Sequence, residues 1–534
     1  MLTGNPVVAK AVAELFGSDE EADCKIVFYV KERVPGEDGA SEEAGCSPSR
    51  RPADDDAAPS RKTRKVEREI GSSLPGHKFV LRSTSEWFRT KIGRWAGEAP
   101  NVGGADDLGL ELRVSLNSEE EEPAARAAIG FAYTGRVQAG SIREALEVRR
   151  QAAYLQVEGG VEACDEFIRG RLQAASGSSS SNGGAHGGAA QPPALEFFEC
   201  VALFPDSVEG PSFAALLACA KQALVTHFPD ALAVLNTPRL RKQLLALPAV
   251  AVEVLLAAEA FGTDTEASVL LLLAVWMEAN FNRTDAPTRE RLCRLVRLVQ
   301  LGRTYLSCVL PALAAAFSKG GAENSPLSHN LTREELSAAG ETIYDLTSPW
   351  YSFAARPQCV PDEGATYGWS ISEQELKEAL EAGGDEIRLR LARFQEGMSY
   401  MAARGFLWRP SIDIESGASA AGLFLCCDTS SAYQLPKKRV AGVVCLDTDL
   451  AVHCWEGSAR EVDIVLGFGA LSQFCIGHSR GTDDVLPLLQ PAEIGGAGGP
   501  LAAWGRYLHG GKLSGSLKLR PPPRAAAGAV AAPQ

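Results

Sequence analysis

Residues His77 to Trp87 have the sequence HKFVLRSTSEW, the stretch of this chain that indicates its fold most directly. The short apolar run from His77 to Leu81 predicts a strand. Ser83 and Glu86 have the spacing of a capping box, in which a hydroxyl and a carboxylate bind the free N–H groups at the start of a helix. The pattern therefore predicts a strand that leads directly into a helix carrying Trp87, Phe88 and Ile92.

Motifs on either side extend this pattern. Asp23 and Cys24 precede the apolar run from Lys25 to Val30, which predicts a first strand. Leucine and valine alternate with polar residues from Leu110 to Asn117, which predicts a strand with one buried face. Gly135 closes the sequence FAYTG and is suited to end the preceding helix, because glycine adopts a left-handed cap conformation without steric cost.

Ser141 and Glu144 form a second capping box, and a helix pair follows it as far as Ile168. In this order and at this spacing, the motifs resemble the BTB/POZ domain, a protein-interaction module, over residues 20–172. The resemblance implies an α+β fold, a structural role for His77 and no bond-making chemistry.

We expect residues 1–19 to form an amphipathic helix, because their apolar residues recur at a spacing that places them on one face of a helix. The apolar stripe includes Val8, Val12, Leu15 and Phe16. In the BTB family such a leading helix packs across the partner subunit. The resemblance therefore implies a homodimer formed through the BTB domain, with these four residues as interface candidates.

Residues 194–320 have the apolar period of an all-α bundle. The segment from Leu247 to Asn280 contains a leucine-proline turn, an acidic helix start and Trp276, and it resembles the BACK domain that follows BTB in many adaptor proteins. Apolar residues from Leu292 to Val299 predict one more helix. An unrelated helical domain is the alternative.

From residue 386 the pattern changes to short strands separated by Gly, Ser, Asp and Pro clusters, which is typical of an antiparallel β-sandwich. The strand order and Trp504 resemble the MATH/TRAF-like sandwich of several plant-type BTB-BACK proteins. We expect the loops from Gln434 to Lys438 and from Gly495 to Pro500 to bind an unknown protein substrate, because loops on a rigid sandwich often serve recognition.

Composition separates these regions, since stretches rich in Pro, Gly, Ser and charge cannot bury a core. The multidomain chain is expected to contain an N-terminal amphipathic helix (1–19), a BTB/POZ domain (20–172) with a disordered insertion (34–70), a flexible linker (173–193), a BACK-like helical domain (194–320), a connector (321–385), a β-sandwich domain (386–520) and a disordered tail (521–534).

Charge, cysteine content and hydropathy restrict the partners and the cellular location that we expect for this protein. The 534-residue chain has a net charge of -14, which argues against a nucleic-acid partner, because phosphate contacts need a basic surface. Its 13 cysteines show no repeated pair spacing and indicate reduced thiols, hence a cytoplasmic or nuclear protein or both. The longest apolar run, Ala267 to Met277, is too short to span a bilayer, so we expect no membrane partner.

The candidate chemical groups have structural explanations. Cys426 with Cys427 and His453 with Cys454 lack the two-residue gap of converging metal ligands, and neighbours in a strand point to opposite faces. The sequence contains no Walker loop, dinucleotide-binding glycine motif or HExxH motif. We therefore expect no catalytic, cofactor-binding or metal-binding residues and no enzyme. An enzyme in the C-terminal half is the remaining alternative.

Two charged runs have similar explanations. We interpret the basic run from Arg61 to Lys65 as a solvated loop, with a nuclear-import signal as the alternative. The acidic run from Glu119 to Glu122 precedes a helix, whose N-terminus favours negative charge. This acidic run therefore needs no binding partner to explain it.

The resemblance implies a substrate adaptor of a cullin-RING ubiquitin ligase, which acts by holding ligase and target together. Ligase-binding BTB domains tend to carry a large apolar residue, any residue and a glutamate after this helix, and the matching positions are Ala96, Gly97 and Glu98. Alanine offers less apolar area to a cullin than methionine or leucine would. Trp95, one residue before Ala96, is the candidate that could make the apolar contact instead. The candidates for cullin contact are thus Trp95, Ala96 and Glu98. The alternative is a non-ligase scaffold, for transcriptional or cytoskeletal assembly, that uses BTB only to dimerise.

Overall fold

The protein is a mixed α/β chain with two compact units, Met1–Ala223 and Leu224–Gln534, called here the N-terminal and C-terminal units. Among the described helices, none has both the length and the apolar content needed to cross a membrane. The computed structural model describes residues 6–35, 63–98, 110–177, 191–205, 211–310, 349–381, 388–415, 418–433, 442–488 and 501–522.

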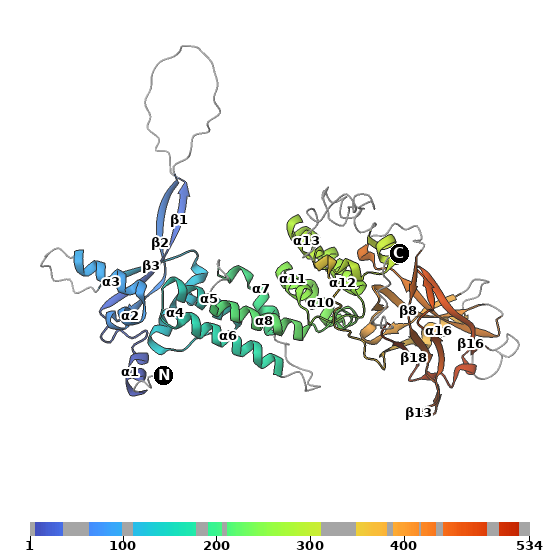
Figure 1. Ribbon diagram of the computed structural model, residues 1–534. Helices are drawn as coiled ribbons and strands as arrows, with labels where there is room; N and C mark the ends of the chain where they lie inside the picture. Colours follow the sequence, from blue (N-terminus) through green and yellow to red (C-terminus); the bar gives the residue numbers. More distant parts are fainter. Residues whose placement is uncertain are drawn as a thin grey trace, which may run out of the picture. The chain divides into compact units, whose positions relative to one another are not determined.

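The N-terminal unit contains a three-stranded sheet in the order β2-β1-β3. Strand β1 (Cys24–Pro35) pairs antiparallel with β2 (Thr63–Gly76) and parallel with β3 (Leu110–Leu116). Strand β3 pairs with β1 only as far as Val30, so the far ends of β1 and β2 project as a two-stranded ribbon (Figure 1). As predicted, β3 alternates buried and exposed residues, because one face lies on the core.

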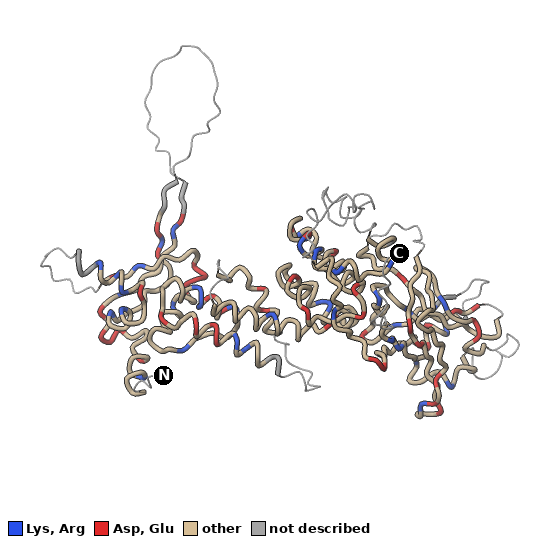
Figure 2. The backbone as a smooth tube through the Cα atoms, viewed as in Figure 1, with Lys and Arg blue, Asp and Glu red and all other residues tan. Residues whose placement is uncertain are grey.

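Acidic and basic residues meet at the base of this ribbon (Figure 2). Arg68 Nε lies 2.7 Å from a carboxylate oxygen of Glu32, and its guanidinium also binds Glu119. Part of the acidic run before helix α4 (Glu122–Thr134) is therefore paired within its own unit.

The other helices that begin in this unit are α1 (Pro6–Glu14), α2 (Lys78–Thr84), α3 (Glu86–Glu98), α5 (Ile142–Tyr154), α6 (Gly160–Gly177), α7 (Pro193–Glu199) and α8 (Pro211–His227). Two predicted helix ends are confirmed. Gly135 ends α4 with a φ of 63°. The Ser141 hydroxyl accepts a hydrogen bond from the Glu144 N–H at 3.1 Å, as a capping box requires.

The predicted strand from His77 to Leu81 is wrong, because β2 ends at Gly76 and α2 begins immediately after His77. The Lys78 N–H, which has no partner within the helix, donates to Asp23 Oδ1 at 2.7 Å. A short apolar run is compatible with either a strand or a buried helix, and here a distant carboxylate stabilises the helix.

The predicted cap of the next helix is also wrong. Ser83 lies inside α2, where its hydroxyl donates to the Phe79 carbonyl at 2.7 Å. Ser85 caps α3 instead, and its hydroxyl accepts from the Phe88 N–H at 3.1 Å. The capping residue is thus the serine between the two helices, two positions later than predicted.

Regular structure extends into the segments predicted to be disordered. Residues 34–35 and 63–70 belong to β1 and β2, and α6 continues through residues 173–177 of the expected linker. Hydrogen bonds to a neighbouring strand or turn can hold a polar stretch in regular structure. The rest of the expected insertion (36–62), most of the linker (178–190) and residues 523–534 lie outside the described residues.

The helical part of the C-terminal unit surrounds α12, which is buried along most of its length and apolar on all sides, as in a core helix. The predicted helix from Leu292 to Val299 is wrong, because the helix ends at Cys293. The Arg297 N–H donates to a carboxylate oxygen of Glu266 at 2.9 Å and does not continue a helix. The helices are α9 (Ala231–Asn236), α10 (Pro238–Ala246), α11 (Ala249–Ala257), α12 (Glu266–Asn280) and α13 (Ala286–Cys293).

Antiparallel sheets complete this unit. One has the order β14-β11-β18-β4-β6, with β17 on β18, and another has the order β16-β9-β8-β5, with β7 on β8. The short pairs β10-β15 and β12-β13 are separate. The strands are β4 (Ala365–Ser372), β5 (Arg388–Leu391), β6 (Arg393–Phe394), β7 (Met401–Ala403), β8 (Phe406–Ile414), β9 (Ala420–Asp428), β10 (Val443–Cys445), β11 (Thr448–Val452), β12 (Trp455–Glu456), β13 (Ala459–Arg460), β14 (Ile464–Phe468), β15 (Gln473–Cys475), β16 (His478–Pro487), β17 (Leu508–His509) and β18 (Lys512–Leu519).

The antiparallel strands were expected, but they begin earlier than residue 386. Strand β4 lies in the expected connector and pairs with β18 along its whole length. Helix α16 (Glu373–Glu381) follows it. The sheets therefore begin at residue 365, and the division of this unit into a BACK-like domain and a separate sandwich stays a prediction.

Candidate functional site

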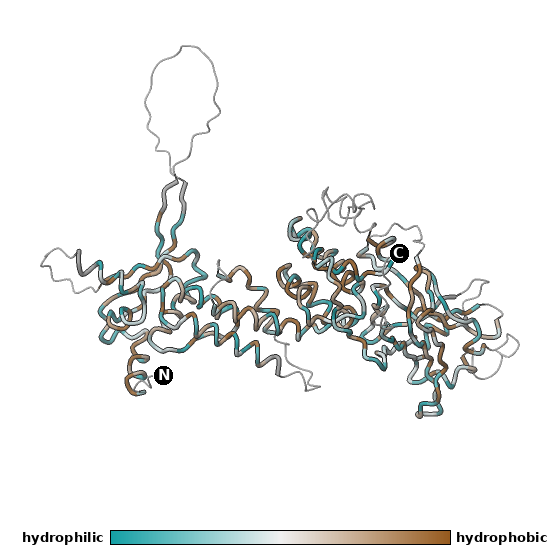
Figure 3. The backbone as a smooth tube through the Cα atoms, in the orientation of Figure 1, coloured by the Kyte–Doolittle hydropathy of each residue, from teal (hydrophilic) through white to brown (hydrophobic). Residues whose placement is uncertain are grey.

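The predicted dimer-interface residues have two different environments. Val12, Leu15 and Phe16 pack against the core of their own unit, and the Phe16 ring centroid lies 5.6 Å from that of Tyr133. Val8 is 58% exposed. Helix α1 is hydrophobic over most of its length (Figure 3), so its first turn presents apolar surface to solvent and its last turn is used internally.

Helix α2 adds a large apolar side chain that the sequence reasoning missed. Phe79 is 79% exposed, whereas its neighbours Val80 and Leu81 are buried. Covering such a ring would contribute about 25 cal/mol for each Å² removed from water. The incorrect strand assignment concealed the exposure of Phe79, because a strand would place Phe79 on the same face as Leu81, which is buried.

His77 connects the start of α2 to two other elements. Its Nε2 lies 2.9 Å from the Glu20 carbonyl oxygen, which only accepts, so Nε2 is the donor in this contact. Its backbone N–H donates to the Tyr133 hydroxyl at 3.0 Å. Burial raises the pKa of Tyr133 to about 12, so this hydroxyl stays protonated at neutral pH. These contacts agree with the structural role predicted for His77.

The predicted cullin-contact residues lie in the last turn of α3, whose backbone is helical to Glu98. The side chains of Trp95, Ala96 and Glu98 lie outside the described residues, as does the segment 99–109 that follows. The two substrate loops, 434–438 and 495–500, also lie outside them. The roles of these residues stay predictions.

In the C-terminal unit, the turn between β7 and β8 is bound on all sides by side chains of other elements. The Arg404 N–H donates to Asp264 Oδ2 at 2.6 Å, and the Gly405 N–H donates to the Ser268 hydroxyl at 3.0 Å. The Gly405 carbonyl accepts from the hydroxyls of Tyr305 and Tyr433. The turn is therefore held by Asp264, by Ser268 of α12 and by two buried tyrosines.

Strand β7, which leads into this turn, pairs with β8 along one edge and is bound at the other edge by the amide of Asn236. Asn236 Oδ1 accepts from the Ala402 N–H at 2.6 Å, and Asn236 Nδ2 donates to the Ala402 carbonyl at 2.9 Å. Asn236 is the last residue of α9. This two-bond contact supplies the hydrogen bonds that a second neighbouring strand would make.

A cavity of about 370 Å³ lies beside the start of α12. Its walls include Thr265 and Glu266 from the helix start, Arg356 and Asp362 from the segment before β4, and Pro521 beyond β18. Arg356 Nε lies 3.0 Å from a carboxylate oxygen of Glu266, and the two side chains are 1% and 2% exposed. Burying these charges is tolerable only because they are paired.

The four residues considered as metal ligands do not form a metal site. Cys427 is buried while Cys426 is partly exposed, as expected for alternating residues of β9. His453 Nδ1 lies 3.4 Å from the Ser514 hydroxyl. Among the residues that the structure describes, no group of three or more His, Cys, Asp or Glu side chains could hold a metal ion.

The buried thiols are also poorly suited to nucleophilic chemistry. Burial raises the pKa values of Cys24, Cys164 and Cys293 to about 12, so these thiols are protonated at neutral pH. The exposed turn of α1, the Phe79 ring and the cavity are features suited to binding.

No known family model matches the chain, and no curated protein is similar to it.

Proposed function

We propose that the chain is a dimeric protein-interaction adaptor with a BTB/POZ-like N-terminal unit. The observation that carries this proposal is the exposed apolar surface of α1 and α2, where Val7 is 73% and Phe79 is 79% exposed. A two-fold symmetric dimer buries the same surface on both subunits, so a single apolar surface on each chain is enough to form the interface. Val8 of α1 is exposed as well, and a partner subunit that covers Val7, Val8 and Phe79 would remove their apolar surface from water.

The order of elements supports the finer fold proposal. Two paired strands, a helix pair, a third strand and further helices follow one another, as in the BTB/POZ resemblance. Helices α9 to α13 support a BACK-like domain, and the antiparallel sheets after them support a β-sandwich. In this proposal the N-terminal unit dimerises and the C-terminal unit binds a protein substrate.

Light scattering of the full chain at micromolar concentration tests the dimer. We expect twice the monomer mass of 56.7 kDa, and a shift toward that monomer mass in Val8→Glu and Phe79→Glu, because a buried carboxylate is costly. The matched control is Val462→Glu, an exposed valine of the C-terminal unit, which should leave the mass unchanged. A monomeric wild-type chain would contradict the proposal.

We further propose that the adaptor recruits a cullin through Trp95, Ala96 and Glu98 of α3. Calorimetry with a cullin amino-terminal domain should detect binding that weakens in Trp95→Ala and Glu98→Ala. No detectable heat at about 100 μM, which corresponds to less than ~5.5 kcal/mol, would favour the non-ligase scaffold. Exposed apolar surface on α1 and α2 is compatible with that scaffold too, so the cullin measurement separates the two functions.

A further inference from the structure

The cavity beside the start of α12 is lined by two buried groups that lack hydrogen-bond partners. Arg356, whose side chain is 1% exposed, uses Nε for Glu266 and Nη2 for the Leu295 carbonyl at 3.3 Å. Its Nη1 has no partner among the described residues. The Thr265 hydroxyl is at the N-cap position of α12, makes no capping bond and also has no partner there. Native proteins rarely leave buried polar groups unpaired, so a bound group would complete both of them.

The charged groups around the cavity already have interactions of their own. The Arg356 guanidinium pairs with the Glu266 carboxylate. Asp264 Oδ2 accepts from the Arg404 N–H at 2.6 Å and lies 4.0 Å from Arg404 Nε. Asp362, the third acidic residue of the lining, has an interaction too. A charge on the ligand would therefore be buried without a partner, at a high cost, so the lining favours a neutral ligand.

The two unpartnered groups indicate which neutral group fits. The guanidinium of Arg356 only donates, so Nη1 requires an acceptor, whereas the Thr265 hydroxyl can donate or accept. A carboxamide has a carbonyl oxygen that accepts and an NH2 group that donates, so it can satisfy both groups without bringing a charge. Both groups are buried, so a side chain that enters the cavity reaches them more readily than a main chain that lies across the surface.

We propose that this cavity binds a carboxamide side chain, asparagine or glutamine, of a peptide segment. The carbonyl oxygen accepts from Arg356 Nη1, and the same carboxamide supplies the partner of the Thr265 hydroxyl. A volume of about 370 Å³ is within the range of ligand sites, so it accommodates such a side chain with its adjoining backbone. The inference rests on the proposed role of the C-terminal unit as the receptor for a protein substrate, and it names the chemistry by which one side chain of that substrate would be recognised.

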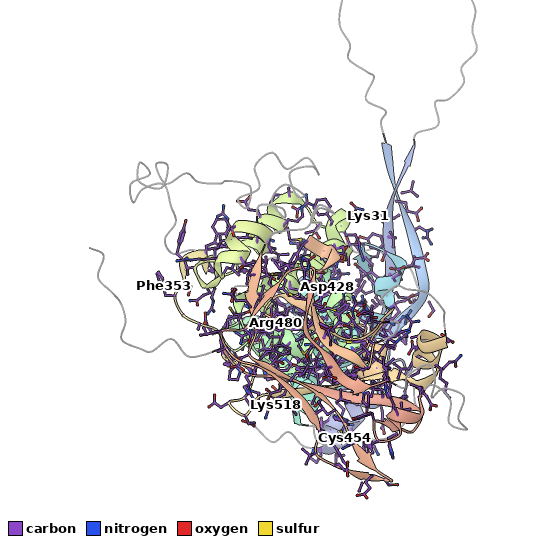
Figure 4. All side chains as sticks on the ribbon, turned by 90° about the vertical axis from the view of Figure 1, so that its right-hand side faces the viewer. Lys31, Phe353, Asp428, Cys454, Arg480 and Lys518 are labelled. Carbon is purple, nitrogen blue, oxygen red and sulfur yellow. The ribbon has the colours of Figure 1, made fainter. Side chains whose placement is uncertain are left out.

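An apolar contact for such a peptide lies close by. Gln300, which lines the cavity, donates to the Phe353 carbonyl at 2.8 Å. The Phe353 side chain is 85% exposed and lies at the outer edge of its unit (Figure 4). Pro521 and Pro522 add apolar surface to the cavity wall. A peptide seated in the cavity can therefore bury apolar area as well as its carboxamide group.

The test titrates the full chain with four acetylated and amidated pentapeptides, each with two alanines on either side of a central asparagine, glutamine, leucine or glutamate. Saturation-transfer NMR follows the signals of the peptides. We expect the tighter of the two carboxamide peptides to bind about fivefold more tightly than the leucine peptide, the effect of one hydrogen bond. It should also bind more tightly than the glutamate peptide, whose charge would be buried without a partner.

Two variants remove one cavity group each. Thr265→Val should weaken the tighter carboxamide peptide about fivefold, and it removes a hydroxyl that makes no capping bond, so the helix should stay folded. Arg356→Lys keeps a positive charge beside Glu266 but has no Nη1, so it should weaken this peptide as well. The matched control is Thr366→Val, the same change at an exposed position of β4 outside the cavity lining, which should leave binding unchanged.

Thermal melting of each variant checks that the unit is folded. A leucine or glutamate peptide that binds as tightly as both carboxamide peptides would overturn the inference. No binding of any peptide at about 1 mM, or unchanged carboxamide affinity in a folded cavity variant, would overturn it too and would indicate that the cavity holds only water. Light scattering and cullin calorimetry on the same protein test the proposed function separately, so a dimer that binds a cullin but no carboxamide peptide refutes this inference alone.

Discussion

Gly405→Ala is expected to destabilise the C-terminal unit severely, because the substitution adds a methyl group at the most crowded point of the β7–β8 turn. The added Cβ would lie 2.0 Å from the Tyr305 hydroxyl oxygen and 2.7 Å from the Ala267 carbonyl oxygen. The tyrosine can rotate away, but the carbonyl belongs to the buried helix α12 and cannot move independently.

Three costs add in this variant. Gly405 has a φ of 76°, a left-handed conformation that costs an alanine about 1–2 kcal/mol. Moving Tyr305 breaks its hydrogen bonds to the Gly405 carbonyl and to the Tyr433 hydroxyl, each about 1 kcal/mol. Overpacking against α12 costs about 1–3 kcal/mol. The sum, about 4 kcal/mol or more, lies among the largest effects of single substitutions.

Urea unfolding followed by tryptophan fluorescence measures this cost, with Gly457→Ala as the matched control. Gly457 has a similar φ of 61° but open space around its Cβ position, so the control includes the backbone cost alone. We expect the free energy of unfolding of Gly405→Ala to fall about 3 kcal/mol below that of Gly457→Ala. A difference under about 1 kcal/mol would refute the close contact between the turn and α12.

Two further predictions concern the C-terminal unit. Asn236→Leu should lower the free energy of unfolding by about 2 kcal/mol, because the N–H and carbonyl of Ala402 lose their partner; an unchanged urea midpoint would contradict the two-bond contact. Burial lowers the pKa of His227 below its ordinary value of 6.5, so the unfolded chain binds a proton that the folded chain does not. Stability should therefore decrease as the pH falls through 6.5, and denaturation of His227→Gln should show a weaker decrease between pH 7 and 5.5.

Local features were predictable from the sequence by itself. The alternation of β3, the glycine that ends α4 and the Ser141 cap of α5 were all predicted correctly. Each depends on periodicity or on bonds between residues a few positions apart, which the order of residues specifies directly. The apolar helix α12 and the antiparallel strands after residue 386 were predictable for the same reason.

Only the tertiary structure decided which short segments are helices and which surfaces are open to binding. The run after His77 is helical, with its first free N–H bound to Asp23 far back in the chain, and this places Phe79 in solvent. The Gly405 turn depends on Ser268, 137 positions away in the sequence. The cavity likewise joins the start of α12 to residues near the end of β18. No local sequence pattern predicts such contacts, because their energies depend on residues that only the folded chain brings together.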